Sequence, residues 1–220
     1  MERSSSSYYF HSRPELRVLV PVDAQRILDV GCGAGELGRL LKAERPGVTV
    51  AGIELERTVA AVASAVLDRV ICGDAEDIEI PFQPGDFDCV IFADVLEHMR
   101  NPVDTIRRYT SLLRPGGSVV ASVPNIAHLS VILNLLRHRW FYSERGLLDK
   151  GHVRFFTRSS VLELFESLGF RKITLEREYR LTDRPAEHSH QTTARFFARI
   201  LLGDHLAYRF YVLASDCVEV

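Results

Sequence analysis

The strongest constraint on this chain is a run of glycines that follows a short apolar segment and precedes an amphipathic one. Residues 27–30 are typical of a buried strand, and residues 36–42 carry leucines on one helical face. Between them stand Gly31, Gly33 and Gly35. Glycine adopts positive φ readily and has no Cβ to keep a ligand from the backbone. A strand, a glycine turn and a helix in this order predict a nucleotide-type binding site, and the alternative is a tight turn without a ligand.

The composition is that of a globular protein with one domain. The 220 residues are 46% hydrophobic and 25% charged, which suits one α/β domain with a full core. The net charge of −2 argues against a nucleic-acid partner, because nucleic-acid-binding surfaces are usually basic. No apolar run approaches the ~20 residues of a membrane span, and the first residues lack the apolar core of a signal peptide.

The cysteines indicate a reducing compartment. They are scattered without a C-x-x-C pair, and three of the four lie beside or within predicted strands. We therefore expect reduced, mostly buried thiols in a cytoplasmic protein, and no zinc site. The four residues are Cys32, Cys72, Cys89 and Cys217.

The glycine turn belongs to an alternating series of strands and helices. After the first strand and helix, apolar segments predict strands at 48–53, 69–72, 87–92 and 118–123. Helices are expected at 58–67 and from Asn101-Pro102 to a turn at 114–117. Strands that alternate with helices in this way form a doubly wound parallel sheet, so the sequence predicts an α/β fold.

The two ends of the chain depart from this alternation. The pattern predicts helices at 126–138 and 161–168, the second with a capping box of Ser160 and Glu163, and strands at 170–180 and 208–214. A short helix should lie beside the first strand. The aromatic cluster around Tyr8 and Tyr9 is either a flap over a ligand or an N-terminal plug.

Carboxylates follow two of the predicted strands. Glu54 ends the second strand, about 20 residues beyond the glycines, where dinucleotide folds hold ribose hydroxyls; alternatively it caps the helix that begins near Arg57. Asp74 lies just beyond the third strand and could accept a hydrogen bond from an amine such as an adenine amino group. Ligands bind at this edge of open parallel sheets, so we expect both groups at one site.

Together these motifs resemble the class I S-adenosylmethionine-dependent methyltransferases. The segments that carry the resemblance are Asp29–Gly35, Gly52–Glu54, Gly73–Ala75, Asp94–His98 and Leu113–Gly117. The downstream segment 149–157 resembles a bacterial subgroup often linked to sugar, cell-envelope or secondary-metabolite pathways. The resemblance implies a seven-stranded Rossmann-like sheet of order 3-2-1-4-5-7-6, with strand 7 antiparallel and a helical insertion after strand 5.

The resemblance also implies how the chain is divided and what it binds. Residues 1–220 would form a single methyltransferase domain, in which 1–24 are an N-terminal flap, 25–125 the cofactor-binding core, and 126–157 with 181–203 the acceptor-side insertions. The cofactor would be S-adenosylmethionine and its product S-adenosylhomocysteine. The residues that would hold it are Tyr9, Asp29, Gly31, Cys32, Gly33, Gly35, Glu54, Leu55, Gly73, Asp74, Ala75, Asp94, Val95, Leu96 and His98.

A nicotinamide-binding reductase is the nearest rival on the glycine turn alone. Its third glycine would fall one position later, where this chain has Glu36. An anionic side chain at the start of that helix would oppose a pyrophosphate, which helix N-termini otherwise attract. A sulfonium nucleoside carries no phosphate, so the sequence favours the methyltransferase.

Methyl transfer from a sulfonium requires mainly that nucleophile, methyl carbon and sulfur be aligned. A hydroxyl acceptor must also lose a proton, and His152 is the candidate base, unless it only packs beneath Trp140 and Phe155. The candidate acceptor-binding residues are Asn125, Trp140, Tyr142 and Arg154.

His188 and His190 have the spacing of a metal pair on a strand, but without a third ligand we expect no metal.

Three functions remain open at this point. The first is methyl transfer to a hydroxyl oxygen of a small molecule such as a sugar or secondary metabolite. The second is methylation of nitrogen or a carboxylate on a peptide or metabolite, and the third is a non-catalytic cofactor-binding or scaffold protein. Nucleic acid is not expected as a substrate, because Asp94–Glu97 replaces the proline-rich turn of amino-methylating DNA enzymes. The protein could be a monomer or a homodimer.

Overall fold

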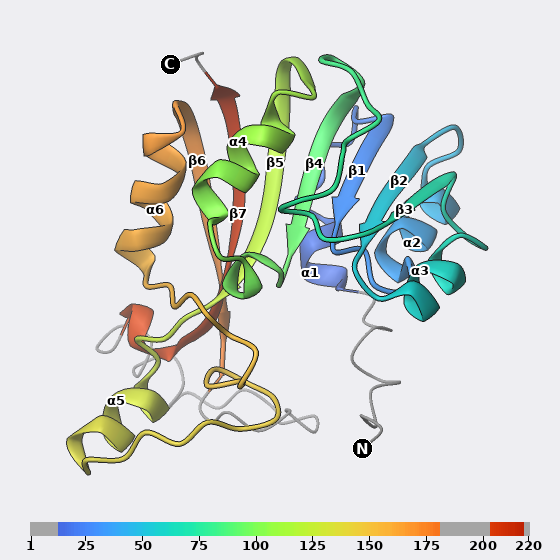
Figure 1. Ribbon diagram of the computed structural model, residues 1–220. Coiled ribbons are helices and arrows are strands. Elements are labelled where there is room, and N and C mark those ends of the chain that lie inside the picture. The colour runs from blue at the N-terminus through green and yellow to red at the C-terminus, as the bar shows by residue number, and fades with distance from the viewer. Residues whose placement is uncertain (1–12, 181–202, 218–220) are drawn as a thin grey trace.

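A computed structural model describes residues 13–180 and 203–217, and a seven-stranded sheet runs through these residues (Figure 1). The strand order is β3-β2-β1-β4-β5-β7-β6, as the resemblance implied. β1 to β5 are parallel, whereas β7 lies antiparallel between β5 and the edge strand β6. The strands are β1 Arg26–Val30, β2 Thr49–Glu54, β3 Arg69–Cys72, β4 Phe87–Ala93, β5 Leu113–Pro124, β6 Phe170–Tyr179 and β7 Ala207–Cys217.

Helices cover both faces of the sheet and divide the core into two clusters. The α-helices of the described residues are α1 Pro14–Arg17, α2 Glu36–Glu44, α3 Arg57–Ala63, α4 Pro102–Thr110, α5 Leu129–Leu136 and α6 Arg158–Ser167. Short 3-10 helices follow β4 (η1, Leu96–His98) and precede β7 (η2, Gly203–Leu206). α4 and α6 pack on one face, and α1 and α2 with the end of the α3 segment pack on the other.

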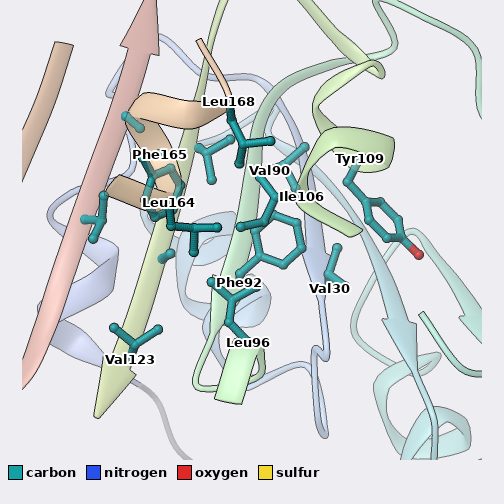
Figure 2. Packing of buried hydrophobic residues seen from close by; sticks show 14 of the residues in the cluster. Val30, Val90, Phe92, Leu96, Ile106, Tyr109, Val123, Leu164, Phe165 and Leu168 are labelled. Carbon is teal, nitrogen blue, oxygen red and sulfur yellow. The ribbon is translucent and has the colours of Figure 1, made fainter. Parts of the chain in front are cut away.

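β4 shows why the sheet takes this form. Its side chains alternate, so that Val90 and Phe92 enter the cluster beneath α4 and α6, while Cys89 and Ile91 enter the opposite one. Figure 2 shows the first cluster, in which Phe92 lies beneath α4 and close to Tyr109. A strand buried on both faces needs apolar residues at nearly every position, which explains the unbroken apolar run.

Several expected element ends are wrong, and local hydrogen bonds explain most of them. α5 begins at Leu129 rather than residue 126, because Ile126 pairs with Phe156 and the His128 side chain caps the helix at Ser130 N. The expected turn at 114–117 is part of β5, which already pairs with Phe87 at Leu113. α3 ends at Ala63, before the expected residue 67.

The capping box of α6 is made by a different pair from the one expected. Thr157 is the N-cap: its hydroxyl accepts from Ser160 N, and the Ser160 hydroxyl accepts from Thr157 N. Glu163 therefore has no part in the cap. The cysteines are all free, but only Cys32 and Cys89 are buried, so the expectation of mostly buried thiols was wrong for the other two.

The segment that was expected to form part of the acceptor side, residues 126–157, stands apart from the layered core. Figure 1 shows α5 beyond the carboxyl end of β5, away from the helices that cover the sheet. Val131 of α5 packs in a small separate cluster with Leu147 and Tyr208. Most of the second insertion, residues 181–202, lies outside the described residues. Among the residues that are described, no helix is long and apolar enough to cross a membrane.

Candidate functional site

The glycine turn folds against the ends of β2 and β4. All three glycines have positive φ, of 75°, 56° and 80° at Gly31, Gly33 and Gly35. The N–H groups of Gly31 and Cys32 both donate to the Ile53 carbonyl, at 2.8 and 3.0 Å. A Cβ on Gly31 would lie 2.8 Å from Cγ2 of Val95, so only glycine lets the turn approach the loop after β4 this closely.

Two buried carboxylates stand beside this turn. The Glu54 carboxylate accepts hydrogen bonds from Gly33 N and Glu56 N, each at 2.9 Å. Glu56, rather than Glu54, is the N-cap residue of α3. Since each carboxylate oxygen can accept from more than one donor, Glu54 retains capacity for a ligand hydroxyl.

Asp29 is buried deeper and is less well satisfied. Asp29 is only 2% exposed, and its Oδ1 has no hydrogen-bond partner in the described residues. Burial raises the pKa of Asp29 to about 6; Arg13 opposes the shift and Glu54 adds to it. A buried acceptor without a donor is costly, so the site suits a ligand that brings a donor or a positive charge.

The Asp74 and Ala75 positions are held by neighbouring groups. Asp74 Oδ1 accepts from Glu76 N at 2.9 Å, and its Oδ2 lies 3.6 Å from the Arg100 guanidinium. The Tyr109 hydroxyl donates to the Ala75 carbonyl at 3.0 Å. Gly73 N donates to Glu54 O at 2.9 Å, which links this loop to the end of β2. The turn, Glu54 and Asp74 thus meet at the carboxyl edge of β1, β2 and β3.

Asp94 at the end of β4 has an unusual backbone conformation and charged neighbours. Its φ of 52° is in the left-handed region, which non-glycine residues occupy mainly where the surroundings impose it. Its Oδ1 accepts from the Ser122 hydroxyl at 2.7 Å and lies 3.0 Å from Nε of Arg209. Arg13 lies 3.8 Å from the other oxygen.

Sequence reasoning missed Arg13 and Arg209. One lies before β1 and the other on β7, so only the fold brings them to Asp94. A signal was available for Arg209, because a cation in the otherwise apolar segment 207–214 must find a buried partner. It also pairs with Glu178, which accepts a hydrogen bond from Tyr211 at 2.7 Å.

Two imidazoles lie face to edge beyond Asp94. The ring centroids of His98 and His152 are 4.9 Å apart, at an interplanar angle of 70°. Nδ1 of His98 is 2.9 Å from the Gly151 carbonyl, and Nδ1 of His152 is 3.2 Å from the Leu147 carbonyl. Burial, reinforced by His98, lowers the pKa of His152, so the ring is neutral near pH 7.

Glu97 completes this group, although it was not among the expected site residues. It is 2% exposed, and burial followed by the charge of Asp94 raises its pKa to about 8. One ligand atom each from Glu97, His98 and His152 lies within 4.8 Å of the others. The expectation of no metal rested on the scattered cysteines and on His188 and His190, which lie outside the described residues, and it did not consider these three residues.

The other predicted cofactor residues occupy varied environments. Leu96 is buried in the core beneath α4, so only its backbone could line a ligand, whereas Leu55 is exposed. Burial raises the pKa of the Cys32 thiol, whose Sγ lies 3.6 Å from the Gly33 carbonyl. Tyr9 lies outside the described residues.

The predicted acceptor residues divide into an aromatic group and two polar residues. The Trp140 ring lies 5.7 Å from Phe155 and 6.2 Å from Tyr142, and Phe155 in turn lies 6.4 Å from His152. His152 thus faces both His98 and the aromatic cluster, and contact with this cluster was the alternative to its role as a base. Arg154 donates to the Arg100 carbonyl.

Asn125 has an environment that favours a structural role. It is fully buried, and its amide donates to the carbonyls of Asp204 and Ala207 at 2.9 and 2.7 Å. Its Oδ1 accepts from Ala127 N at 3.0 Å. These bonds hold the start of β7 against the end of β5, and direct contact with an acceptor stays a prediction.

Comparison with known proteins gives consistent similarities. A family model described as a methyltransferase domain matches residues 7–175. A ubiquinone biosynthesis O-methyltransferase from Albidiferax ferrireducens is 31% identical over 180 residues, which is 75% of this chain and 70% of that protein. One from Xanthomonas campestris is 34% identical over 154 residues, 66% of this chain and 61% of that protein. The crystal structure of a SAM dependent methyltransferase from Archaeoglobus fulgidus shares the fold, with a TM-score of 0.68 at 18% identity, covering 97% of this chain and 95% of that one.

Proposed function

Since the chain belongs to the class I S-adenosylmethionine-dependent methyltransferases, we propose that it methylates a hydroxyl oxygen of a small molecule. The observation that carries the proposal is the neutral, partly buried His152 beside His98 at the carboxyl end of β4. Relatives named O-methyltransferases at about 30% identity support oxygen as the acceptor atom. The acceptor that we propose is a hydroxyl of a sugar or secondary metabolite.

The residues of the site fit S-adenosylmethionine independently of the comparison with relatives. When bound, this cofactor supplies an electrophilic methyl group on a sulfonium. The unpartnered oxygen of buried Asp29 and the glycine turn suit its amino-acid part, and Glu54 suits its ribose hydroxyls. Asp74 and the Ala75 backbone would hold the adenine, and the segment from Asp94 to His98 would line the methyl end.

The chain's own residues then position the acceptor and remove its proton. Donation of the Nδ1 proton of His152 to the Leu147 carbonyl leaves the lone pair on Nε2. A hydroxyl held there would pass its proton to Nε2 as its oxygen attacks. The ring is already neutral near pH 7, so no prior deprotonation is needed.

The aromatic cluster gives the acceptor an apolar wall. Trp140, Tyr142 and Phe155 are partly exposed although they contact one another, which leaves ring surface for a ligand. The acceptor side would comprise residues 126–157 and 181–203. Such variable segments are where enzymes of one fold differ in substrate.

The proposal is tested by incubating the chain with methyl-labelled S-adenosylmethionine and acceptors that differ only in the accepting atom. Matched sets of phenols, sugar hydroxyls, amines and carboxylates would be compared, with S-adenosylhomocysteine release as a second readout. We expect labelled methyl ethers from hydroxyl acceptors. Turnover confined to amines or carboxylates would contradict the proposal, and cofactor binding without turnover on any acceptor would favour a non-catalytic protein.

A further inference from the structure

We propose that Glu97, His98 and His152 form a binding site for one divalent transition-metal ion. The three residues come from two segments, η1 and the loop before α6, and their ligand atoms lie within 4.8 Å of one another. A carboxylate oxygen and two imidazole nitrogens are a donor set that proteins use for such ions. The inference deepens the proposed hydroxyl methylation and rests on it for its chemical role.

Glu97 supplies the second observation. Its Oε2 is buried and has no hydrogen-bond partner in the described residues, although the residue is only 2% exposed. Burying a carboxylate without a partner costs several kcal/mol by the usual transfer arguments, and buried charges are normally paired or bound to a metal. A cation between Glu97 and the imidazoles would remove that cost.

Both histidines are oriented as metal ligands usually are. Each has its Nδ1 directed at a backbone carbonyl, of Gly151 for His98 and of Leu147 for His152. Such a bond fixes the tautomer that carries the lone pair on Nε2, and metal-bound histidines nearly always have a partner of this kind.

The two segments that supply the ligands are fastened together. The Glu97 carbonyl accepts from Val153 N at 2.8 Å and Arg154 N at 3.0 Å. A Cβ on Gly151 would lie 3.2 Å from Nδ1 of His98, which shows how closely the loop fits against η1. The three ligands are therefore held near one another without an ion.

Neighbouring charges limit the site to these three ligands. Both oxygens of Asp94 face cations, with Arg209 3.0 Å from one and Arg13 3.8 Å from the other. Asp94 would thus act on the ion through its charge rather than by coordination. Two imidazoles with one carboxylate suit Zn²⁺, Mn²⁺, Co²⁺ or Fe²⁺ better than Ca²⁺ or Mg²⁺, which prefer oxygen ligands.

Three protein ligands leave at least one coordination position open. An acceptor hydroxyl bound there would ionise at lower pH, as water does on zinc. Its O–H bond breaks, the proton passes to solvent water, and the oxygen is left as the nucleophile for the methyl carbon. In the ion-loaded protein His152 Nε2 would be a ligand, and the ion would replace it in activating the hydroxyl.

Direct binding measurements test the site without cofactor or acceptor. The tag-free chain would be stripped with a chelator and dialysed separately against Zn²⁺, Mn²⁺ and Co²⁺, and the bound metal measured by elemental analysis. We expect one ion per chain. Co²⁺ should also quench the fluorescence of Trp140, the one tryptophan of the sequence, which lies against Phe155 beside His152.

Variants locate the ion. Glu97→Gln and His152→Ala should each weaken binding at least tenfold, since even outer partners of metal ligands contribute roughly 10–100-fold. The matched controls are Glu166→Gln, an exposed carboxylate, and His205→Ala, whose Nδ1 also meets a backbone carbonyl, and both should bind normally.

The outcomes separate the two proposals. Absence of stoichiometric binding, or binding that survives both Glu97→Gln and His152→Ala, would overturn the metal site. Full hydroxyl methylation by the chelated chain would overturn the role of the ion in activating the hydroxyl, while leaving the proposed function intact. Stoichiometric binding that these variants abolish would uphold the site even if no hydroxyl acceptor were methylated.

Discussion

The two halves of the site are built in different ways. On the proposed cofactor side, backbone groups hydrogen-bond to buried carboxylates at the ends of β1 and β2, and one example is the bond from Gly33 N to Glu54. On the proposed acceptor side, large apolar side chains lie exposed, among them Leu136 and Phe141, each 72% accessible. A cofactor shared by a whole family can be held by the fold itself, whereas an acceptor is selected by side chains that the fold does not require.

Removal of His152 should have the largest effect, and it acts at the boundary between the two halves. We expect His152→Ala to lower turnover on a hydroxyl acceptor by about 10²–10⁴-fold, the usual contribution of general-base catalysis. Because the pKa of His152 is lowered, wild-type turnover should fall only at pH below the ordinary histidine range. Steady-state rates from pH 5 to 9 check this, with His205→Ala as control. Unimpaired turnover across pH would favour an acceptor that is already deprotonated.

Glu54→Ala should weaken cofactor binding while leaving the acceptor side intact. Hydrogen bonds to a charged group contribute about 1.5–3 kcal/mol, so we expect the dissociation constant for S-adenosylhomocysteine to rise by about 10–150-fold. Isothermal titration calorimetry measures it, and Glu79→Ala, at an exposed loop position, is the control. Equal affinity in the two variants would mean that Glu54 serves only the backbone of Gly33 and Glu56.

Asp29→Asn should stabilise the folded chain at neutral pH in the absence of cofactor. The folded-state pKa of Asp29 is raised to about 6 from 3.8, so the native state binds the proton more tightly and loses stability as pH rises through this range. A shift of two units corresponds to about 3 kcal/mol. In urea denaturation without cofactor, the variant should be about 1–3 kcal/mol more stable than wild type at pH 7.5, with the difference vanishing near pH 4. A less stable variant at neutral pH would show that the ionised carboxylate has a donor.

Phe141→Ser should have the smallest effect and tests whether the exposed apolar residues matter to folding. Substitutions at such positions usually change stability by less than about 0.5 kcal/mol. We expect an unchanged melting temperature and unchanged affinity for S-adenosylhomocysteine, but a raised KM for the acceptor. A clear drop in melting temperature would mean that the acceptor side is packed as firmly as the cofactor side.

The sheet could be predicted from the sequence because burial on both faces leaves a visible pattern. β3 runs from Arg69 to Cys72, as expected, and the other strands of the described residues differ from expectation mainly at their ends. The ends of the helices were harder to predict than the strands, because they depend on particular hydrogen bonds. Nothing in the local sequence of α6 distinguishes Thr157 from Ser160 as its N-cap.

The candidate site could be predicted where its residues lie on one motif or directly follow a predicted strand. Gly31, Gly33 and Gly35 follow β1 directly, and their positive φ values confirm the reason for glycine at each position. The neighbours of Asp94 could not be read in this way. Arg209 reaches Asp94 through the register of β7 on β5, where it is paired with Pro124. Contacts between residues so far apart in the sequence are set by tertiary structure, and the periodicity of apolar residues does not predict them.

The place of β7 in the sheet has a consequence for synthesis of the protein. The outer edge of β5 is covered only by β7. Because β7 is translated after α5, α6 and β6, this edge stays unpaired until most of the chain has been made. Until then a nascent chain presents an unpaired, strongly apolar strand edge, the kind of surface on which chains associate wrongly. The contact between Asp94 and Arg209 also forms only at this last step, so a ribosome-bound intermediate could form the glycine turn before Asp94 has its partner on β7.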